Sequence, residues 1–266
     1  MDEHELLKRR ILELAERASS RGYPTHTAFI PLSEQSVLKE LENEKRASLN
    51  ANRIGEAQFL LYGGNEENES KVLFLYPDYC DLSEEKEKEE NGETIVVLHI
   101  EGKKAEYAQQ LSHRDYLGAL MNLGYEREQF GDILVEGKEA YVFLFKSIAE
   151  EVAKNLLSVS HTYVKNSLIL PKDCPFHPVK EEKSINVSSP RLDAVLAEVY
   201  SLSREEAQRI IEKGDVLLGI APNENVSYLL KGGELIATRG KGKFVYLGEE
   251  KTSRKGRLFV KVAVYH

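Results

Sequence analysis

The sequence predicts an α+β fold in two domains. Short runs of β-branched and aromatic residues alternate with segments whose apolar residues recur at helical spacing. The length of 266 residues fits two domains of ordinary size. A stretch with several prolines and little apolar content, 171–185, is interpreted as the linker between them.

The first region, 1–54, is predicted to be a helical region. Leu7, Ile11 and Leu14 recur at helical spacing. Pro24 and Pro31 then interrupt the chain, and a second helix follows through 37–41. We interpret the region as a helical cap on the next domain.

The second region, 55–170, is predicted to form an α+β domain. Apolar runs predict strands at 59–62, 72–76, 94–100, 132–135, 140–145 and 163–170. Helical spacing predicts helices at 115–123 and 148–157. The run of Glu and Lys at 83–91 is interpreted as a solvated loop. This alternation is typical of a ferredoxin-like, RNA-recognition-like α/β sandwich.

The last region, 186–266, is predicted to be a small domain of two helices and a sheet. Ser189 and Pro190 predict the start of the first helix, with Arg191 in its first turn. Ser203 and Glu206 have the spacing of a capping box for the second helix. Gly214 is predicted to end that helix in a left-handed conformation. Strands follow at 216–220 and 235–238, and then a hairpin through 245–264.

Charge is distributed unevenly along the chain, whose net charge is −8. From Asn186 onward there are 13 Lys and Arg against 10 Asp and Glu, a net of +3, so the preceding residues carry −11. A basic domain on an acidic body favours nucleic-acid binding, although the excess is small.

The polar residues of the last domain favour RNA as the ligand. Arginine presents a planar fork to phosphate oxygens, helix N-termini attract anions, and glycine lets a backbone approach phosphate closely. For any single residue a solvated surface charge is the simpler interpretation, but the set favours RNA. The candidate RNA-binding residues are Ser189, Arg191, Ser203, Arg204, Gln208, Lys213, Lys231, Arg239, Lys241 and Lys243.

Several motifs in this domain occur in a specific order. They are Ser189-Pro190-Arg191-Leu192-Asp193, Ser203-Arg204-x-x-Ala207-Gln208, Lys213-Gly214-Asp215-Val216 and Lys231-Gly232-Gly233-Glu234-Leu235. Together they resemble the RNA-binding domain named after ribosomal small-subunit protein S-four. The stretch 218–223 departs from the Val-Asn-Gly that members of that family often have after the first strand.

Motifs of the second region extend the resemblance over nearly the whole chain. They are Tyr62-Gly63-Gly64, Tyr76-Pro77-Asp78-Tyr79, the run from His113 to Gly124, and Gln129-Phe130-Gly131-Asp132-Ile133. The chain thereby resembles the YlmH-like S-four-domain proteins, a family encoded near bacterial cell-division genes. The resemblance implies binding to rRNA and tRNA on the large ribosomal subunit carrying peptidyl-tRNA. It also implies a part in the rescue and tailing of stalled nascent chains, which is ribosome-associated quality control.

Catalytic and metal sites are not expected. His113-Arg114-Asp115 lacks the asparagine five residues further on that a kinase loop needs. Asp115 is expected to cap a helix, and His113 and Arg114 are candidates for a second RNA or ribosome contact. Cys174 and His177 are too few for a zinc site, and we expect no cofactor. The alternatives are an RNA-modification enzyme or its targeting subunit, and a cell-division adaptor protein.

The remaining expectations concern location and assembly. No apolar run approaches the ~18 residues of a membrane span, and the acidic N-terminus is unlike an export signal. Two distant cysteines fit a reducing cytoplasm. We therefore expect a cytoplasmic, bacterial protein, monomeric and without a membrane partner.

Overall fold

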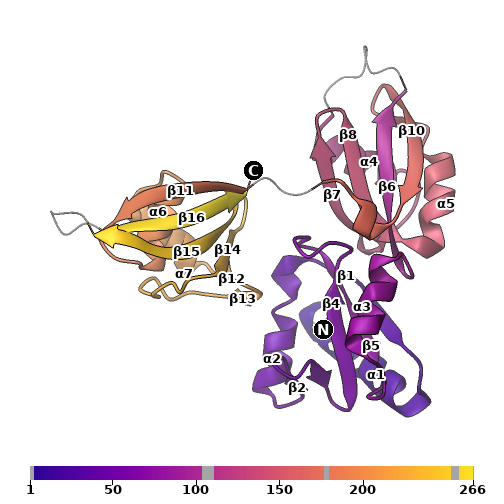
Figure 1. The fold of residues 1–266 in the computed structure, drawn as a ribbon, viewed down its shortest axis with the longest axis horizontal. Coiled ribbons are helices and arrows are strands. Elements are labelled where there is room, and N and C mark those ends of the chain that lie inside the picture. Colours follow the sequence, from indigo (N-terminus) through magenta and orange to yellow (C-terminus); the bar gives the residue numbers. More distant parts are fainter. Residues whose placement is uncertain (1–2, 104–110, 177–179, 253–257, 266) are drawn as a thin grey trace. The chain divides into compact units, whose positions relative to one another are not determined.

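The computed structural model describes residues 3–103, 111–176, 180–252 and 258–265. The chain divides into two compact units, Met1–Phe176 and His177–His266 (Figure 1). The first unit contains two sheets and the second contains one. None of the helices in the described part of the chain has the length and apolar character needed to cross a membrane.

The first sheet is antiparallel, with the strand order β1-β5-β4-β3-β2. Its strands are β1 (Thr25–Ile30), β2 (Ala47–Ser48), β3 (Arg53–Ile54), β4 (Ala57–Tyr62) and β5 (Lys71–Tyr76). The helices in this part of the chain are α1 (Glu3–Arg21), the 3-10 turn η1 (Leu32–Glu34), α2 (Val37–Asn43) and α3 (Leu82–Glu90).

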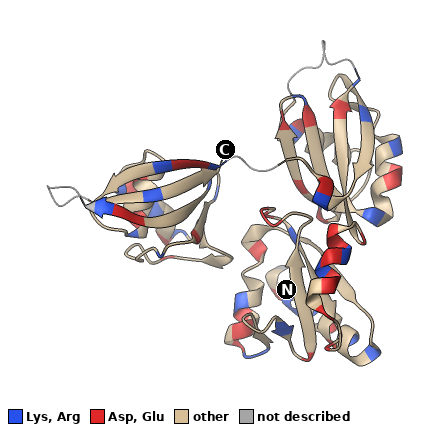
Figure 2. Cartoon of the chain, in the orientation of Figure 1, with Lys and Arg blue, Asp and Glu red and all other residues tan. Residues whose placement is uncertain are grey.

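Two predictions for this part of the chain are wrong. Residues 1–54 are not only helical, because β1 lies between Pro24 and Pro31 and pairs with β5, with Phe29 opposite Val72. Strands β4 and β5 therefore belong to this sheet and not to the ferredoxin-like one. Residues 83–91 were predicted as a loop, but they form α3, along which acidic and basic residues alternate (Figure 2). Asp81 caps it by accepting from Ser83 N–H at 2.8 Å.

The second sheet and its helices confirm the prediction of a ferredoxin-like fold. This fold covers Ile95 to Ile169, a shorter range than the predicted 55–170. Strands and helices follow one another as β6 (Ile95–Gly102), α4 (His113–Met121), the 3-10 turn η2 (Arg127–Gln129), β7 (Phe130–Glu136), β8 (Glu139–Phe145), α5 (Lys146–Asn155), β9 (Ser158–Val159) and β10 (Thr162–Ile169). The order β7-β8-β6-β10-β9 places the two βαβ halves as the ferredoxin-like topology requires. Helices α4 and α5 contribute Tyr116, Leu120 and Val152 to the core on one face of this sheet.

The two sheets of the first unit share a second core on the opposite face. Phe29, Phe74 and Tyr76 of the first sheet pack in one buried cluster with Tyr141 and Phe143 of the second. A Cβ on Gly64 would lie 2.4 Å from a Phe143 ring carbon, and Gly64 has φ +88°. Only glycine fits this close approach, which gives a physical reason for the Tyr62-Gly63-Gly64 motif.

The second unit is a six-stranded antiparallel sheet with two helices against it. Its elements are β11 (Lys180–Val187), α6 (Leu192–Val199), α7 (Arg204–Glu212), β12 (Val216–Leu218), β13 (Ala221–Pro222), β14 (Glu234–Thr238), β15 (Gly242–Thr252) and β16 (Leu258–Tyr265). The predicted linker 171–185 is wrong at both ends: Pro171–Asp173 is a 3-10 turn, and β11 pairs with β16 along eight residues. The charged run 180–183 gave no strand signal in the sequence, and the partner strand of β11, β16, lies at the other end of the domain in sequence.

Candidate nucleic-acid interface

The two helices of the second unit begin differently. Helix α7 has the predicted capping box: Ser203 N–H donates to the Glu206 carboxylate at 2.8 Å, and Glu206 N–H donates to Ser203 Oγ at 3.2 Å. Gly214 ends this helix with φ +73°, as predicted. Helix α6 starts later than predicted. Arg191 is its N-cap in an extended conformation, so Ser189 is not the capping residue.

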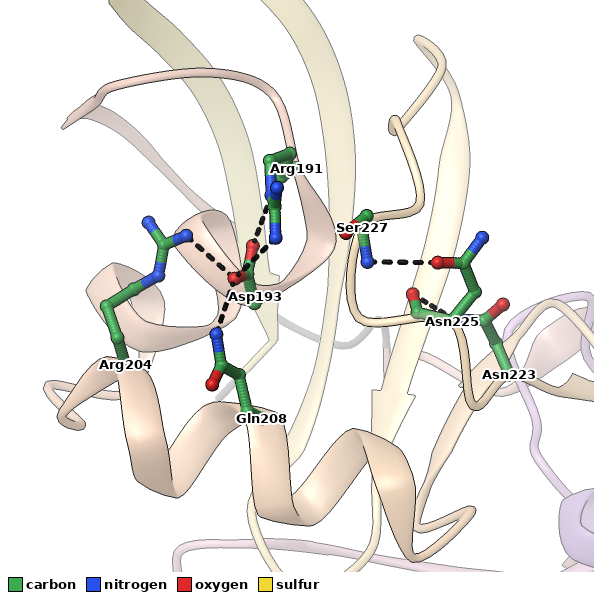
Figure 3. Close-up of polar contacts among 7 residues, drawn as sticks. All are labelled: Arg191, Asp193, Arg204, Gln208, Asn223, Asn225 and Ser227. Carbon is green, nitrogen blue, oxygen red and sulfur yellow. Dashed lines mark hydrogen bonds and ion pairs between the residues drawn. The ribbon is translucent and has the colours of Figure 1, made fainter.

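Three of the candidate residues converge on one carboxylate (Figure 3). Arg191 donates from Nε to Oδ1 of Asp193 at 3.1 Å and from a terminal nitrogen to Oδ2 at 3.2 Å. Arg204 donates to Oδ2 at 2.7 Å, and Gln208 donates to the same oxygen at 3.2 Å. Arg204 and Gln208 are four residues apart on α7, so they lie on one face of this helix, and both side chains reach Asp193 of α6.

The electrostatics of this cluster stabilise a buried carboxylate between two partly exposed arginines. Asp193 is 0% exposed, whereas the side chains of Arg191 and Arg204 are 35% and 45% exposed. Burial alone would raise the pKa of Asp193. Hydrogen bonds from Arg191, Gln208 and Arg204 outweigh that effect, so the pKa lies below its ordinary value. Two arginines around one carboxylate leave the cluster with a net positive charge. Because both guanidinium groups are partly exposed, they can also donate hydrogen bonds to a ligand from solvent.

A loop lies beside Arg191 on the other side of this cluster (Figure 3). Arg191 and Leu229 form an isolated antiparallel bridge, secured by Leu192 N–H to Tyr228 O at 2.8 Å and Leu230 N–H to Pro190 O at 2.9 Å. Within the loop, Ser227 N–H donates to Asn225 Oδ1 at 3.0 Å. The residues before and after Arg191 are therefore both hydrogen-bonded to this loop, which fixes the backbone at Arg191.

The basic glycine-containing segment forms the turn between β14 and β15. Lys241 N–H donates to Thr238 O at 3.0 Å, and both Gly240 and Gly242 have positive φ. Arg239 is 79% exposed and lies 3.6 Å from Asp215. The pKa of Glu206 is lowered first by its hydrogen bonds from Ser203 and then by Arg209 and Lys241, so Lys241 acts electrostatically at the start of α7.

The other candidates of this unit are more dispersed. Lys213 is the exposed C-cap of α7, at the opposite end from Arg204. Lys231 is exposed, and its backbone N–H donates to Glu234. Lys243 lies 4.6 Å from the centre of the Tyr265 ring. Because its neighbour Phe244 points into the core under the helices, Lys243 lies on the sheet face away from them.

His113 and Arg114 differ from each other in environment. Ser112 caps α4, and both its N–H and its Oγ donate to Asp115 at 2.7 Å, so the predicted capping role of Asp115 is confirmed. Partial desolvation and, next, the charge of Arg127 lower the pKa of His113. Its ring is therefore neutral near pH 7 and offers hydrogen bonds, not charge. Arg114 is exposed and lines a polar cavity.

Sequence reasoning did not single out Asp193, the carboxylate on which three of the candidate residues converge. It is in the Ser189–Asp193 motif, but no side-chain role was predicted for it. The available signal was an acidic residue inside the otherwise apolar helix 192–199, two residues after an arginine. Among the described residues, no group of three His, Cys, Asp or Glu lies close enough to hold a metal ion. His177, which the sequence analysis considered beside Cys174, lies outside the described residues.

A family model and a sequence relative agree with the resemblance found in the sequence. A family model described as "Putative RNA-binding domain in YlmH" matches residues 90–169, which include the ferredoxin-like part. The ribosome-associated protein quality control protein P2 of Bacillus subtilis (strain 168) is 30% identical over 218 residues, covering 82% of this chain and 78% of that protein. The solved structure of the cell division protein ylmH from Streptococcus pneumoniae is 22% identical with a TM-score of 0.45, covering 64% of this chain and 93% of that one.

Proposed function

The chain belongs to the YlmH family, whose relative in Bacillus subtilis is named as a ribosome-associated quality-control protein, and from this premise we propose how it acts. It binds structured rRNA or tRNA on the large ribosomal subunit carrying peptidyl-tRNA. It acts there without catalysing a reaction, and its binding supports rescue and tailing of stalled nascent chains.

The observation that carries the proposal is the orientation of Arg191 and Arg204 by buried Asp193. An exposed arginine loses side-chain entropy when it binds phosphate. Holding both guanidiniums in advance reduces that loss and sets the spacing of the donors. Arg239 and Lys241 are further exposed cations, in the β14–β15 turn, and the charge of Lys241 reaches Glu206 at the start of α7. A shaped phosphate site of this kind suits folded RNA.

The first prediction concerns the salt dependence of RNA binding. Changing Arg239→Ala together with Lys241→Ala removes two exposed cations without leaving a buried charge unpaired. We expect the slope of log affinity against log salt to fall by about 1–2, because each phosphate contact contributes roughly 0.7–0.9. Fluorescence anisotropy with rRNA at several salt concentrations measures this slope.

The matched control is Arg9→Ala with Arg17→Ala, which removes the same charge from exposed positions of α1. Its slope should equal that of the unchanged protein. Equal slopes for the two double variants would contradict a phosphate-binding turn.

The second prediction concerns the ribosome. Sedimentation of cell extracts should place the protein with large subunits, and more strongly when translation is stalled. Arg191→Lys with Arg204→Lys keeps the charge but loses the planar forks, so the same gradients should contain less of it. If the protein stayed at the top of the gradient with and without stalling, the ribosomal role would be refuted.

A further inference from the structure

The sheet of the second unit has one face that points away from its helices. Val260 and Val264 of β16 contribute to the core beneath α6 and α7 (Figure 1). Because side chains alternate along a strand, their neighbours Phe259 and Tyr265 point to the opposite face. Both aromatic rings are partly exposed. Aromatic side chains on an open sheet face are the usual means by which proteins stack unpaired bases.

Lysine side chains lie over both of these rings. Nζ of Lys243 is 4.6 Å from the centre of the Tyr265 ring, and Nζ of Lys180 is 5.1 Å from it. Nζ of Lys251 is 5.2 Å from the centre of the Phe259 ring. All three distances are within the range of cation–π attraction. The face therefore holds ammonium groups directly beside aromatic rings.

The charge of this face differs from that of the chain as a whole. On β11, β15 and β16, its described charged side chains are four lysines against two glutamates, a net of +2, whereas the whole chain carries −8. They are Lys180, Lys243, Lys251, Lys261, Glu182 and Glu250. Between the two rings, Val245 lies opposite Ala263 in the ladder. A basic surface with aromatic and aliphatic groups complements a polyanion whose bases are exposed.

The energetics allow a base to replace a lysine on each ring. An exposed cation–π contact changes an equilibrium constant by a factor of only about 2–5. Stacking of a base on an aromatic side chain is worth roughly 5–150-fold. The displaced ammonium group can then pair with a phosphate next to the stacked base. The exchange therefore favours bound RNA.

The spacing of the rings indicates the form of the RNA. Tyr265 lies six residues after Phe259 on β16, so the two side chains leave the backbone about 20 Å apart, at roughly 3.3 Å per residue. Two neighbouring bases of one strand cannot reach across that distance. An extended strand of several nucleotides can reach both rings. A base within a duplex has both of its faces stacked already, so the strand must be unpaired.

We propose that this face of the second unit binds an unpaired RNA strand, with one base stacked on Tyr265 and another on Phe259. Lys180, Lys243 and Lys251 contact the phosphates of that strand. The proposal rests on the RNA-binding function above. It adds a second RNA surface, on the side of the sheet opposite to α6 and α7.

The test uses the full chain and two RNA probes. One is a blunt hairpin duplex, and the other is the same duplex with an unpaired 3′ extension of about eight nucleotides, within the usual site size of such surfaces. The unchanged protein should bind the extended probe at least about tenfold more tightly in anisotropy titrations. Phe259→Leu with Tyr265→Leu keeps apolar bulk but removes the planar rings. This variant should lose the preference and keep its affinity for the blunt duplex.

The matched control removes two exposed tyrosines of the first unit. Tyr79 and Tyr163 are 73% and 70% exposed, and Tyr79→Leu with Tyr163→Leu should leave the preference unchanged. Lys180→Gln with Lys243→Gln should lower the salt slope for the extended probe toward that for the duplex. Thermal melts of each variant show whether the second unit is folded at the temperature of the titrations.

A direct readout is available because the chain contains no tryptophan. Tyr265→Trp introduces a single indole at the proposed stacking position and keeps a planar ring there. Its fluorescence should be quenched by the extended probe and not by the blunt duplex. Tyr163→Trp, in the first unit, should respond to neither probe. This measurement detects stacking even if the leucine variant fails to fold.

The outcomes separate this proposal from the function on which it rests. If the unchanged protein bound neither probe, RNA binding itself would be refuted, and this proposal with it. Equal affinity for both probes, or a preference that survives Phe259→Leu with Tyr265→Leu, would overturn the strand-binding face alone. If that variant instead dissociated a dimer or released a protein partner while its RNA binding stayed unchanged, the face would be a protein interface and the proposal would also fail.

Discussion

Asp193 has a charge opposite to that expected at the proposed RNA-binding surface, and its geometry explains its place there. A fully buried carboxylate is costly unless it is paired and hydrogen-bonded. Arg191 and Arg204 supply both, so the same contacts stabilise α6 against α7 and orient two cations. In the proposed RNA site, stability and RNA binding are therefore coupled at this residue.

The prediction at the residue scale is that Asp193→Asn weakens RNA binding although it makes the site more positive. Simple charge counting predicts tighter binding. Loss of orientation predicts weaker binding and a smaller salt slope, because the two guanidiniums no longer present their donors together. Anisotropy titrations well below the melting temperature measure both quantities. Tighter binding with a steeper slope would contradict the orienting role.

Thermal melts provide the control for this variant. Asp193→Asn should cost about 1–3 kcal/mol, the range for hydrogen bonds to charged groups, since the freed arginines can turn to solvent. Arg191→Ala with Arg204→Ala leaves the carboxylate buried without a cation and should cost more. A weak RNA affinity in that double variant is ambiguous, and Asp193→Asn avoids the ambiguity.

At the scale of the element, β11 decides where the second unit begins. It pairs with β16 over eight residues, from Lys180 opposite Tyr265 to Val187 opposite Leu258. It also packs Ile185 and Val187 on the core of α6 and α7. Without β11, the central strand β16 would become an exposed edge.

The prediction at this scale compares two fragments of the chain. A fragment from His177 to His266 should unfold in urea as one cooperative transition. A fragment starting at Asn186, the boundary predicted from sequence, lacks most of β11 and should be several kcal/mol less stable or aggregate, because apolar area buried by Ile185 and edge pairing are lost. Equal midpoints would show that β11 is dispensable.

At the scale of the whole molecule, the first unit is held together by a core to which both of its sheets contribute. Asp132 of the second sheet also accepts from Glu69 N–H at 2.7 Å and from Ser70 N–H at 2.9 Å, in the connection that leads into β5 of the first sheet. The two sheets are therefore expected to unfold together, independently of the second unit.

Phe143→Ala tests that expectation. Removing a fully buried phenylalanine should cost about 3–5 kcal/mol. Calorimetry should show the transition of the first unit lowered as a whole, with the transition of the second unit unchanged. Separate melting of the first and second sheets in this variant would contradict the shared core. Leu229→Ala, at an exposed leucine of the second unit, is a control that should leave the first transition in place.

Local signals predicted the elements whose residues interact over short distances. The capping box of Ser203 and Glu206, the left-handed Gly214 and the two adjacent strands β7 and β8 follow from neighbouring residues, and all three were predicted. The ferredoxin-like alternation was also readable, because each of its helices and strands has its own periodicity. The family motifs narrowed the function to RNA and the ribosome.

Only the tertiary structure decided which strands share a sheet and which polar groups meet. The pairing of β1 with β5, and of β11 with β16, joins residues more than 40 positions apart, and no local pattern specifies such a partner. The same holds for Asp193 and Arg204, which lie on different helices. By itself, the sequence determined the helices other than α3, the hairpins and a set of candidate cations. Long-range packing decided that a buried carboxylate orients two of those cations, because burial and distance are properties of the fold.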